Sequence, residues 1–224
     1  MAAISALPSD AQQHLAKLSV CAIADAMAQL KIQGHIVDVT LLRGITAPLT
    51  VNICGPAFTV QVVPATGPAV SKLPFHYVDL IEVGQVIVIS APTDTTTGVF
   101  GGLLASASKI RGAAGVVTNG RIRDIEEISS ICLPIFSCGT TVHGQRGSTM
   151  VASVKCPVVI GGCVVRNNDI IRGDINGVIV IPVEHAAEIA AKAQIIEEQD
   201  NKIADAVKQG VGLQQSFQQF RPKL

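Results

Sequence analysis

Residues 101–128 read GGLLASASKIRGAAGVVTNGRIRDIEEI, a run in which helical and strand patterns alternate. Two glycines precede a helical pattern at 103–112, and the apolar run at 114–118 has the composition of a short buried strand. An Asn-Gly turn at 119–120 leads into a second helical pattern at 125–131. Helices that alternate with buried strands are typical of an α/β sheet with parallel strands.

Outside this run, the chain begins and ends with helical patterns. A helical pattern near Ser9 is followed by Ser19, a good N-cap for an amphipathic helix at 20–30. Strand signals occur at 51–63, with a break at Gly55-Pro56, and at 85–90. Residues 156–182 carry strand signals interrupted by three hairpin-type turns, including Asn167-Asn168. This mixture predicts an α/β fold over residues 1–224, a single layered domain with a mixed sheet, in which 183–224 form a long C-terminal helix and tail.

The composition predicts an oligomer that does not bind nucleic acid or a membrane. Hydrophobic residues make up 48% of the 224 residues and charged residues 15%, so we expect a homo-oligomer that buries part of the apolar surface. Seventeen basic residues balance seventeen acidic ones, which argues against electrostatic capture of nucleic acid. We find neither a membrane-spanning run nor a secretory signal pattern. The six cysteines lack metal-ligand spacing, so we expect small buried residues of a cytoplasmic protein.

Arg123 and Asp124 are the candidate catalytic residues of the opening run. Gly101 and Gly102 let a ligand approach the backbone, and the first amides of the helix that follows point at an anion-binding position. Twenty residues later, Arg123 and Asp124 are expected at the carboxyl end of a strand. Arginine offers a planar fork for a carboxylate, and aspartate offers a hard oxygen ligand for a divalent ion. The pair suits an anionic 2-oxo acid chelated by a metal, although on spacing alone a helix N-cap with a surface salt bridge is the commoner explanation.

Several ordered blocks together resemble one known family. Gly102, Arg123-Asp124 and Glu127 match a pattern of a small or acidic residue, twenty residues, Arg-Asp, and an acidic residue after two more. Further similar blocks are SVCAIADA at 19–26, GPAFTV at 55–60, VGQVIV at 83–88 and DIIRGDINGVIVIP at 169–182. The family is the RraA-like one, which contains the regulator of ribonuclease activity A and the class II 4-hydroxy-4-methyl-2-oxoglutarate aldolases. Its members were once widely labelled demethylmenaquinone methyltransferases.

The resemblance implies a swivelling β/β/α fold, trimers or hexamers, and an active site near a subunit boundary. It implies a lyase that cleaves a carbon–carbon bond of a small 2-oxo acid to give pyruvate, through an enolate stabilised by Mg²⁺ or Mn²⁺. Arg123 would bind the substrate, Asp124 would hold the metal, and the amides of Leu103 and Leu104 would receive the substrate carboxylate. The substrate would be 4-hydroxy-4-methyl-2-oxoglutarate, oxaloacetate or both, because decarboxylation of oxaloacetate leaves the same enolate.

Position 102 departs from the aldolases, in which this residue is often acidic and organises metal-bound water. Gly102 has no side chain, so the metal would depend more on Asp124, and another group must move the proton. Either metal binding would be weaker, or the preferred reaction would shift toward decarboxylation, which needs no base at a substrate hydroxyl. Glu127 is a candidate for a supporting role around the metal. So are Glu197 and Glu198 from the C-terminal helix of a neighbouring subunit, although solvated helix charges are the commoner explanation for these two.

Other functions have weaker sequence signals. The main alternative is a non-catalytic regulator that binds a ribonuclease or a helicase; that branch of the family tends to lose the aspartate that is present here as Asp124. A methyltransferase lacks support, because no glycine-rich nucleotide loop follows an N-terminal strand. A Schiff-base aldolase would use Lys155. His143 is similar to the histidine of phosphohistidine domains, although a lone histidine in a loop is more often an ordinary polar residue. Specificity beyond the pyruvyl half is expected from loops at 91–100 and 142–146.

Overall fold

The computed structural model describes residues 9–42, 51–66 and 73–221. Its helices are α1 (Ser9–Leu15), α2 (Val20–Gln29), η1 (Tyr77–Leu80), α3 (Gly102–Ile110), α4 (Ile125–Ile131), η2 (Val183–His185), α5 (Ala186–Lys208) and α6 (Leu213–Phe220). Its strands are β1 (His35–Ile36), β2 (Thr40–Leu41), β3 (Ile53–Pro64), β4 (Val86–Ser90), β5 (Gly98–Phe100), β6 (Gly115–Thr118), β7 (Arg121–Ile122), β8 (Ile135–Ser137), β9 (Gly139–Thr140), β10 (Thr149–Val154), β11 (Val158–Ile160), β12 (Cys163–Val165), β13 (Ile170–Asp174) and β14 (Gly177–Ile181). The ends of the predicted domain, 1–8 and 222–224, lie outside the described residues.

Strand β3 joins the parallel and antiparallel parts of the large sheet. Its first residues, 53–56, pair antiparallel with β13, residues 57–61 pair parallel with β4, and residues 60–64 pair antiparallel with β10. From β4 the parallel order continues through β6 to β8, and β2 adds an antiparallel edge. On the other side, β13 continues antiparallel to β14 and then β1. The sheet is therefore mixed, as the sequence predicts.

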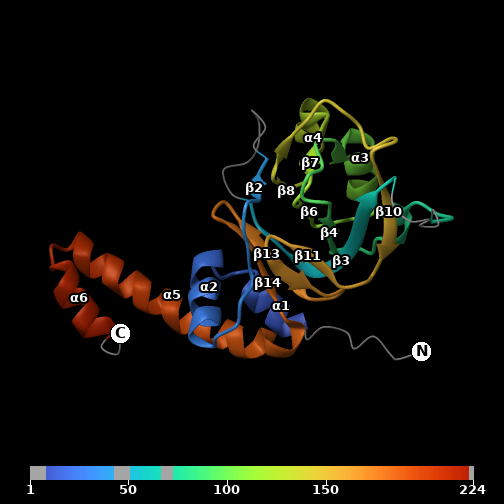
Figure 1. Cartoon of the computed structure of the whole chain (residues 1–224). Coiled ribbons are helices and arrows are strands. Elements are labelled where there is room, and N and C mark those ends of the chain that lie inside the picture. Colours follow the sequence, from blue (N-terminus) through green and yellow to red (C-terminus); the bar gives the residue numbers. More distant parts are fainter. Residues whose placement is uncertain (1–8, 43–50, 67–72, 222–224) are drawn as a thin grey trace.

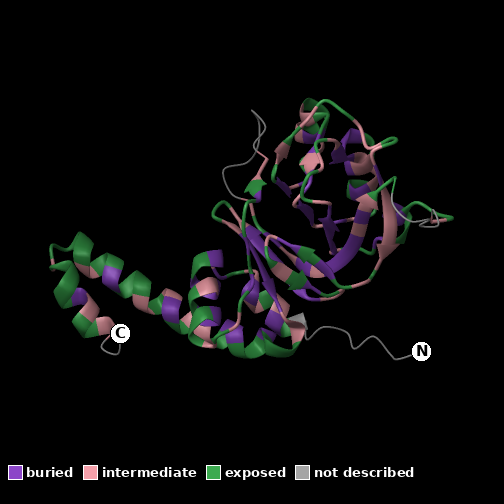
Figure 2. Cartoon of the chain, viewed as in Figure 1, coloured by how far each residue is buried: buried purple, intermediate pink, exposed green. Residues whose placement is uncertain are grey.

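Strand β4 shows that both faces of this sheet are covered. All five of its residues are buried. Ile87 and Ile89 belong to a core that includes residues of α3 and α4, whereas Val86 and Val88 belong to a core that includes residues of β11 and β12. Successive side chains of a strand point to opposite faces, so a strand covered on both sides is apolar at every position. Figure 2 shows the buried residues concentrated in the sheet and the exposed ones on the outer helices.

A third core lies between α1, α2 and α5 on one side and β13 and β14 on the other. Arg172 of β13 is only 4% exposed at the edge of this layer. Its guanidinium donates to the carbonyl oxygens of Leu15 at 3.2 Å, Leu18 at 2.8 Å, Ile53 at 3.4 Å and Gly173 at 2.6 Å. Burial lowers the pKa of Arg172, and nearby Asp174 opposes that shift. One buried cation therefore ties the end of α1 to the sheet.

Helix α5 starts on this layer and then leaves the body of the molecule together with α6 (Figure 1). Ala190 and Ala193 are buried in the core, whereas much of the later part of α5 is exposed. Helix α6 packs back on α5, and Arg221 pairs with Asp200. The predicted long C-terminal helix is confirmed, but the segment predicted as a tail contains a second helix. Gly210, with φ +88°, follows the end of α5, and a second helix begins after Gly212.

Other sequence predictions have mixed outcomes. The N-terminal helices and the long C-terminal helix are confirmed, and Ser19 caps α2 by accepting a hydrogen bond from the amide of Ala22. No helix within residues 9–42, 51–66 and 73–221 is long and apolar enough to cross a membrane. The sequence allowed one strand or two at 51–63, and the structure has one: β3 runs through Gly55-Pro56, and a Cβ on Gly55 would lie 2.1 Å from the carbonyl oxygen of Gly84. This glycine permits a close backbone approach and does not end a strand.

Two further predictions about the C-terminal half and the cysteines are wrong. The turn at Asn167-Asn168 does not close a hairpin, because it joins β12 to β13, which belong to different sheets. The cysteines are not the small buried residues that we expected. Cys21, Cys132 and Cys138 are exposed, and the other three are partly buried. Cys54, Cys156 and Cys163 still pack against the cores, so apolar sequence neighbours predicted partial burial for three of the six.

Replacing Arg172 with leucine is expected to destabilise the fold by about 3 kcal/mol, because the carbonyl groups that it serves lose their donor in a buried layer. The matched control is Arg166→Gln, which removes a surface ion pair to Glu184 and is expected to cost no more than about 1 kcal/mol. Urea unfolding followed by circular dichroism measures both. Equal losses in the two variants would contradict the role of Arg172.

Candidate functional site

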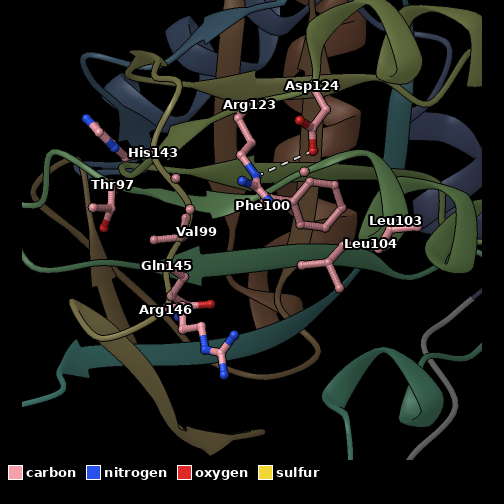
Figure 3. Close-up of a pocket in the computed structure, with 13 residues that line it drawn as sticks. Thr97, Val99, Phe100, Leu103, Leu104, Arg123, Asp124, His143, Gln145 and Arg146 are labelled. Atoms are coloured by element: carbon pink, nitrogen blue, oxygen red, sulfur yellow. Dashed lines mark ion pairs between the residues drawn. The ribbon is translucent and has the colours of Figure 1, made fainter.

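Three short parallel strands end at one cavity. They pair in the order β5–β7–β9, beside the large sheet. The segments that follow them line a cavity of about 750 Å³ (Figure 3). The lining residues are Thr97, Gly98, Val99, Phe100, Gly101, Leu103, Leu104, Arg123, Asp124, His143, Gly144, Gln145 and Arg146. The carboxyl ends of strands are where ligands bind in α/β folds, and the cavity lies at this position.

Backbone hydrogen bonds fix the three segments relative to one another. The amide of Arg123 donates to the carbonyl oxygen of Phe100 at 3.1 Å, which joins the end of β7 to the end of β5. The amide of Thr141 donates to the carbonyl oxygen of Ile122 at 2.9 Å, which joins the segment after β9 to β7. Arg123 and Asp124 thus leave the carboxyl end of β7, the location expected from the sequence.

Asp124 holds the starts of α3 and α4 together. Its backbone is left-handed, with φ 62° and ψ 47°, and its side chain does not cap its own helix, α4. Instead, Oδ2 accepts a hydrogen bond from the amide of Gly102 at 3.1 Å and lies 3.5 Å from Nε of Arg123. The side chain remains 39% exposed, and Oδ1 has no hydrogen bond within the described part of the chain. One carboxylate oxygen is therefore fixed and the other is available to a ligand.

Glycines leave the space that the charged side chains occupy. A Cβ added to Gly101 would lie 2.7 Å from Oδ2 of Asp124, and a Cβ on Gly144 would lie 2.9 Å from Nη1 of Arg123. A Cβ on Gly102 would lie 1.9 Å from Oε2 of Glu127. Contacts this short would force the charged groups to move. Glycine at these positions therefore permits close packing against side chains, in addition to the ligand approach that the sequence suggested.

Glu127 brings a second carboxylate to the start of α3. It lies in the first turn of α4 and is exposed to solvent. Its carboxylate occupies the volume that a side chain at position 102 would enter. An acidic group therefore reaches the start of α3 from α4, although residue 102 is glycine. The positive end of the α3 dipole stabilises carboxylates at this position.

Two amides at the start of α3 are available to an anion. The first hydrogen bond within the helix runs from the amide of Ala105 to the carbonyl oxygen of Gly101. The amide of Gly102 is occupied by Asp124. The amides of Leu103 and Leu104 have no partner among the described residues, as expected for the first turn of a helix. Together with the half-exposed guanidinium of Arg123, they form a donor set for a carboxylate.

The structure brings together all but two of the residues that the sequence predicted for the site. Five of them line the cavity: Gly101, Leu103, Leu104, Arg123 and Asp124. The other two, Gly102 and Glu127, adjoin these residues, with the carboxylate of Glu127 beside position 102. The remaining two, Glu197 and Glu198, lie on α5, which is on the opposite side of the molecule from α3 and α4 (Figure 1). Glu197 accepts a hydrogen bond from the amide of Ser19, and Glu198 accepts one from the side chain of Gln194. Their action from a neighbouring subunit stays a prediction.

The cavity also contains residues that the motif did not single out. Phe100 and Thr97 fall in the loop 91–100, and Gln145 and Arg146 fall in or beside the loop 142–146, which we expected to control specificity. Loop position was the only sequence signal for them. His143 lines the cavity as well, whereas Lys155 does not; its Nζ lies 5.8 Å from the ring centre of Phe58.

Asp124 and Glu127 are the carboxylates that would hold a divalent cation at this site. No group of three His, Cys, Asp or Glu side chains arranged to hold a metal occurs in residues 9–42, 51–66 and 73–221. Two carboxylates, with water and substrate at the other positions, are a typical donor set for Mg²⁺ or Mn²⁺. The residues that are present therefore fit the expected ions.

Comparisons with known sequences place the chain in one family. The family model described as RraA-like, Aldolase/RraA, matches residues 20–180. A protein of Halalkalibacterium halodurans named "Putative 4-hydroxy-4-methyl-2-oxoglutarate aldolase" is 34% identical over 174 residues, 77% of this chain and 80% of that protein. Protein DlpA of Legionella pneumophila is 29% identical over 213 residues, 93% of this chain. The match covers only 33% of DlpA, so this chain spans about a third of that relative.

Comparisons with solved structures agree with the fold. An uncharacterized protein from Pseudomonas syringae pv. tomato superposes with a TM-score of 0.82 at 26% identity, covering 92% of this chain and 96% of that one. RraAS2 of Streptomyces coelicolor, an unusual member of the RNase ES inhibitor RraA protein family, gives 0.76 at 27% identity, covering 86% and 94%. The predicted fold class, an α/β fold of the swivelling β/β/α type with a mixed sheet, is confirmed.

The left-handed backbone of Asp124 predicts how variants at this position behave. Asp124→Asn is expected to keep wild-type stability within about 0.5 kcal/mol, because asparagine tolerates this conformation and can still accept from Gly102. Asp124→Ala is expected to lose about 1–2 kcal/mol, because alanine does not favour it and makes no such bond. Urea unfolding gives the values. Asp124→Gly is the control, since it removes the backbone strain as well as the carboxylate. An alanine variant as stable as the asparagine variant would contradict this account.

Proposed function

Because this chain belongs to the RraA-like family, we propose that it is a divalent-metal-dependent lyase that releases pyruvate from small 2-oxo acids. The relatives named as 4-hydroxy-4-methyl-2-oxoglutarate aldolases support a carbon–carbon lyase. The observation that carries the proposal is that one cavity is lined by the guanidinium of Arg123, two free amides at the start of α3 and the carboxylate of Asp124, with the carboxylate of Glu127 beside the same helix start. Each of these groups has a role in cleaving a bond next to a 2-oxo group.

Substrate binding is the role of Arg123 and the start of α3. The amides of Leu103 and Leu104 would receive the carboxylate at C1, and Arg123 would contact this carboxylate and the 2-oxo oxygen. Arg123 is well placed for this role, because Gly144 lets its guanidinium lie against the wall of the cavity and Asp124 lies 3.5 Å from its Nε. A fixed guanidinium also stabilises the negative charge that develops on the oxo oxygen.

Asp124 and Glu127 would hold Mg²⁺ or Mn²⁺ next to that oxygen. When bound, the ion supplies a Lewis acid that stabilises the developing negative charge. Asp124 has one oxygen engaged by Gly102 and one oxygen that is available. Glu127 supplies the acid that Gly102 lacks, from the same volume. The sequence alone placed nearly all of this work on Asp124.

Decarboxylation of oxaloacetate is the activity that this residue set supports more simply. The bond between C3 and C4 breaks, carbon dioxide leaves, and C3 takes up a proton to give pyruvate. Aldol cleavage of 4-hydroxy-4-methyl-2-oxoglutarate breaks the equivalent bond but also needs a base to remove the proton of the 4-hydroxyl group. We therefore expect decarboxylation to be the faster of the two reactions.

The alternative function, a regulator that binds a ribonuclease or helicase, would not need this arrangement. Its support is the name of the Streptomyces coelicolor structure, which belongs to a family of RNase inhibitors. A regulator has no use for an arginine, an aspartate and free helix amides that line one cavity. Lack of turnover of both substrates with either ion would favour the regulator.

Variants at the site test the lyase directly. Arg123→Ala and Asp124→Asn are expected to lower kcat/KM for oxaloacetate at least about 100-fold, because each removes a stabiliser of the developing charge. Glu127→Ala is expected to lower it about tenfold or more. Chelation with EDTA should abolish turnover, and Mg²⁺ or Mn²⁺ should restore it. Pyruvate formation coupled to lactate dehydrogenase measures the rates.

A rescue experiment isolates the role of Glu127. The double variant Gly102→Asp with Glu127→Ala returns a carboxylate to the same volume, so it is expected to recover activity that Glu127→Ala has lost. Glu126→Gln is the matched control, since Glu126 is the neighbouring acid of α4 and its carboxylate is not among the atoms nearest to position 102. Wild-type activity in Asp124→Asn, or equal effects of Glu126→Gln and Glu127→Ala, would show that the proposed site is wrong.

We also propose that the chain acts as a homo-oligomer, a trimer or a hexamer. Helix α6 and the outer part of α5 extend from the body (Figure 1), and they expose Ile195, Val207 and Leu213, which are 57%, 40% and 55% exposed. Leu103 and Val142, beside the cavity, are 82% and 86% exposed. Apolar side chains exposed on a projecting hairpin are typical of a surface covered by another subunit.

Sedimentation equilibrium should give the mass of three or six chains. Ile195→Glu and Leu213→Glu should shift the assembly toward monomers, because each places a charge where an apolar contact is expected. A monomeric wild-type protein at micromolar concentration would contradict the oligomer.

A further inference from the structure

An apolar patch lies at the end of α3 that is remote from the cavity. Ile110, the last residue of α3, is 87% exposed, Val83 is 86% exposed, and Leu80, the last residue of η1, is 36% exposed. We call these three residues the α3-end patch. None of them belongs to the three hydrophobic cores or to the side chains that pack against those cores. Their side chains therefore contribute little to the packing of a single chain.

Contacts between η1, the loop after it and the end of α3 hold the patch together. The amide of Gly84 donates to the carbonyl oxygen of Gly112 at 2.8 Å, and a Cβ on Gly112 would lie 3.1 Å from a methyl group of Val83. Oδ1 of Asp79, in η1, lies 3.7 Å from Nη2 of Arg111, the residue that follows α3. The three apolar side chains therefore lie on one fixed surface, although they come from two helices and a loop.

Two of the patch residues occupy positions at which a polar residue is usual. Val83 is the second residue of a tight turn, in which the amide of Gln85 donates to the carbonyl oxygen of Glu82 at 3.2 Å and Gly84 has φ +84°. Ile110 lies in the last turn of α3, outside the buried face of that helix. Exposed β-branched side chains favour neither a turn nor a helix end. Contact with another surface explains why both positions are apolar.

The charged residues around the patch make it complementary to a second copy of itself. Asp79 and Glu82 lie on its η1 side, and Arg111 lies on its α3 side. Glu82 forms no ion pair within the residues that the structure describes, and the Asp79–Arg111 pair is open to solvent. In a two-fold contact a surface meets itself in the opposite orientation, so the acidic side of one copy faces the basic side of the other. A nucleic acid or an anionic membrane would instead need a surface of one sign.

We propose that the α3-end patch forms a two-fold contact with the same patch of a second copy of this chain. Val83 and Ile110 of the two copies pack together at its centre, and Arg111 of each copy meets Glu82 of the other at its rim. The contact leaves the cavity open, because the length of α3, about 13 Å, separates the patch from Gly102. It also differs from the surface of the projecting α5–α6 hairpin, so it depends on neither the lyase nor the trimer. Two trimers joined by it make a hexamer.

Sedimentation equilibrium at micromolar concentration tests the contact first. A two-fold contact pairs every copy, so the wild type is expected to have the mass of an even number of chains, two or six. Val83→Glu and Ile110→Glu are each expected to halve this mass. Each variant places two carboxylates in an apolar centre, one from each copy, and should raise the dissociation constant about 100-fold or more. A wild-type mass of one or three chains, or an unchanged mass in both variants, overturns the proposal and leaves the patch to a different partner.

Ile175→Glu is the matched control for these two variants. Ile175 is also a β-branched residue, is 52% exposed, and lies between β13 and β14, outside the α3-end patch. Its variant is expected to keep the wild-type mass. Far-ultraviolet circular dichroism should show all three variants folded, because none of the three side chains belongs to a core. An equal loss of mass in Ile175→Glu would show that any added surface charge breaks the assembly, and the patch would then have no special role.

Exchange of charges between copies tests the two-fold arrangement. Arg111→Glu places an acid opposite Glu82 of the other copy, and Glu82→Arg places a base opposite Arg111, so each variant alone is expected to raise the dissociation constant about tenfold. In an equimolar mixture, each variant supplies the charge that the other lacks, so the mixture is expected to pair about as tightly as the wild type. Native mass spectrometry with one variant isotopically labelled should show mixed pairs. Equal dissociation constants for the mixture and the single variants would contradict the two-fold contact.

Discussion

The site depends on the absence of a side chain at residue 102. A Cβ at this residue would enter the space held by the carboxylate of Glu127, 1.9 Å from its Oε2. The backbone amide of the same residue donates a hydrogen bond to the carboxylate of Asp124. The starts of α3 and α4 can therefore approach until two carboxylates lie beside the positive end of a helix dipole. The free amides of Leu103 and Leu104 lie on the same turn, so opposite charges on a ligand and a metal would meet within one small volume. The closeness of the two helix starts is thus the condition for the chemistry.

The rest of the fold keeps this contact rigid. The three strands β5, β7 and β9 deliver the segments of the site from adjacent positions, and their backbone bonds leave little freedom between them. Beside them, the large sheet is covered on both faces, and β3 binds three different strands along its length. The helices α1, α2 and α5 complete the opposite side, where Arg172 links α1 to the sheet. A site built on such elements positions side chains more closely than one built on free loops.

Two local features carry a cost in the folded chain. Asp124 adopts a left-handed backbone, and Tyr77, Ser108, Gln145 and Thr149 bury side-chain polar atoms that have no hydrogen-bond partner among the described residues. The strain at Asp124 lies at the proposed site, and such conflicts in native proteins gather where function requires them. The four buried atoms are closed off from solvent, so their cost falls on the fold alone.

The sequence by itself determined most elements of the fold and the central pair of the site. Helix caps, strand patterns and glycines act between near neighbours, so α2, α3, α4, β4, β6 and α5 follow from residues within each segment. The same logic placed Arg123 and Asp124 at the end of a strand. Only the tertiary structure decided that Gly55 lies inside β3, that Glu127 fills the space beside Gly102, that Glu197 accepts from the amide of Ser19, and that Tyr77, Gln145 and Thr149 share a cavity. Except for the place of Gly55 within its strand and the nearness of Gln145 to Thr149, these contacts join residues 25 or more positions apart. They depend on strand register and helix packing, which local sequence patterns do not encode.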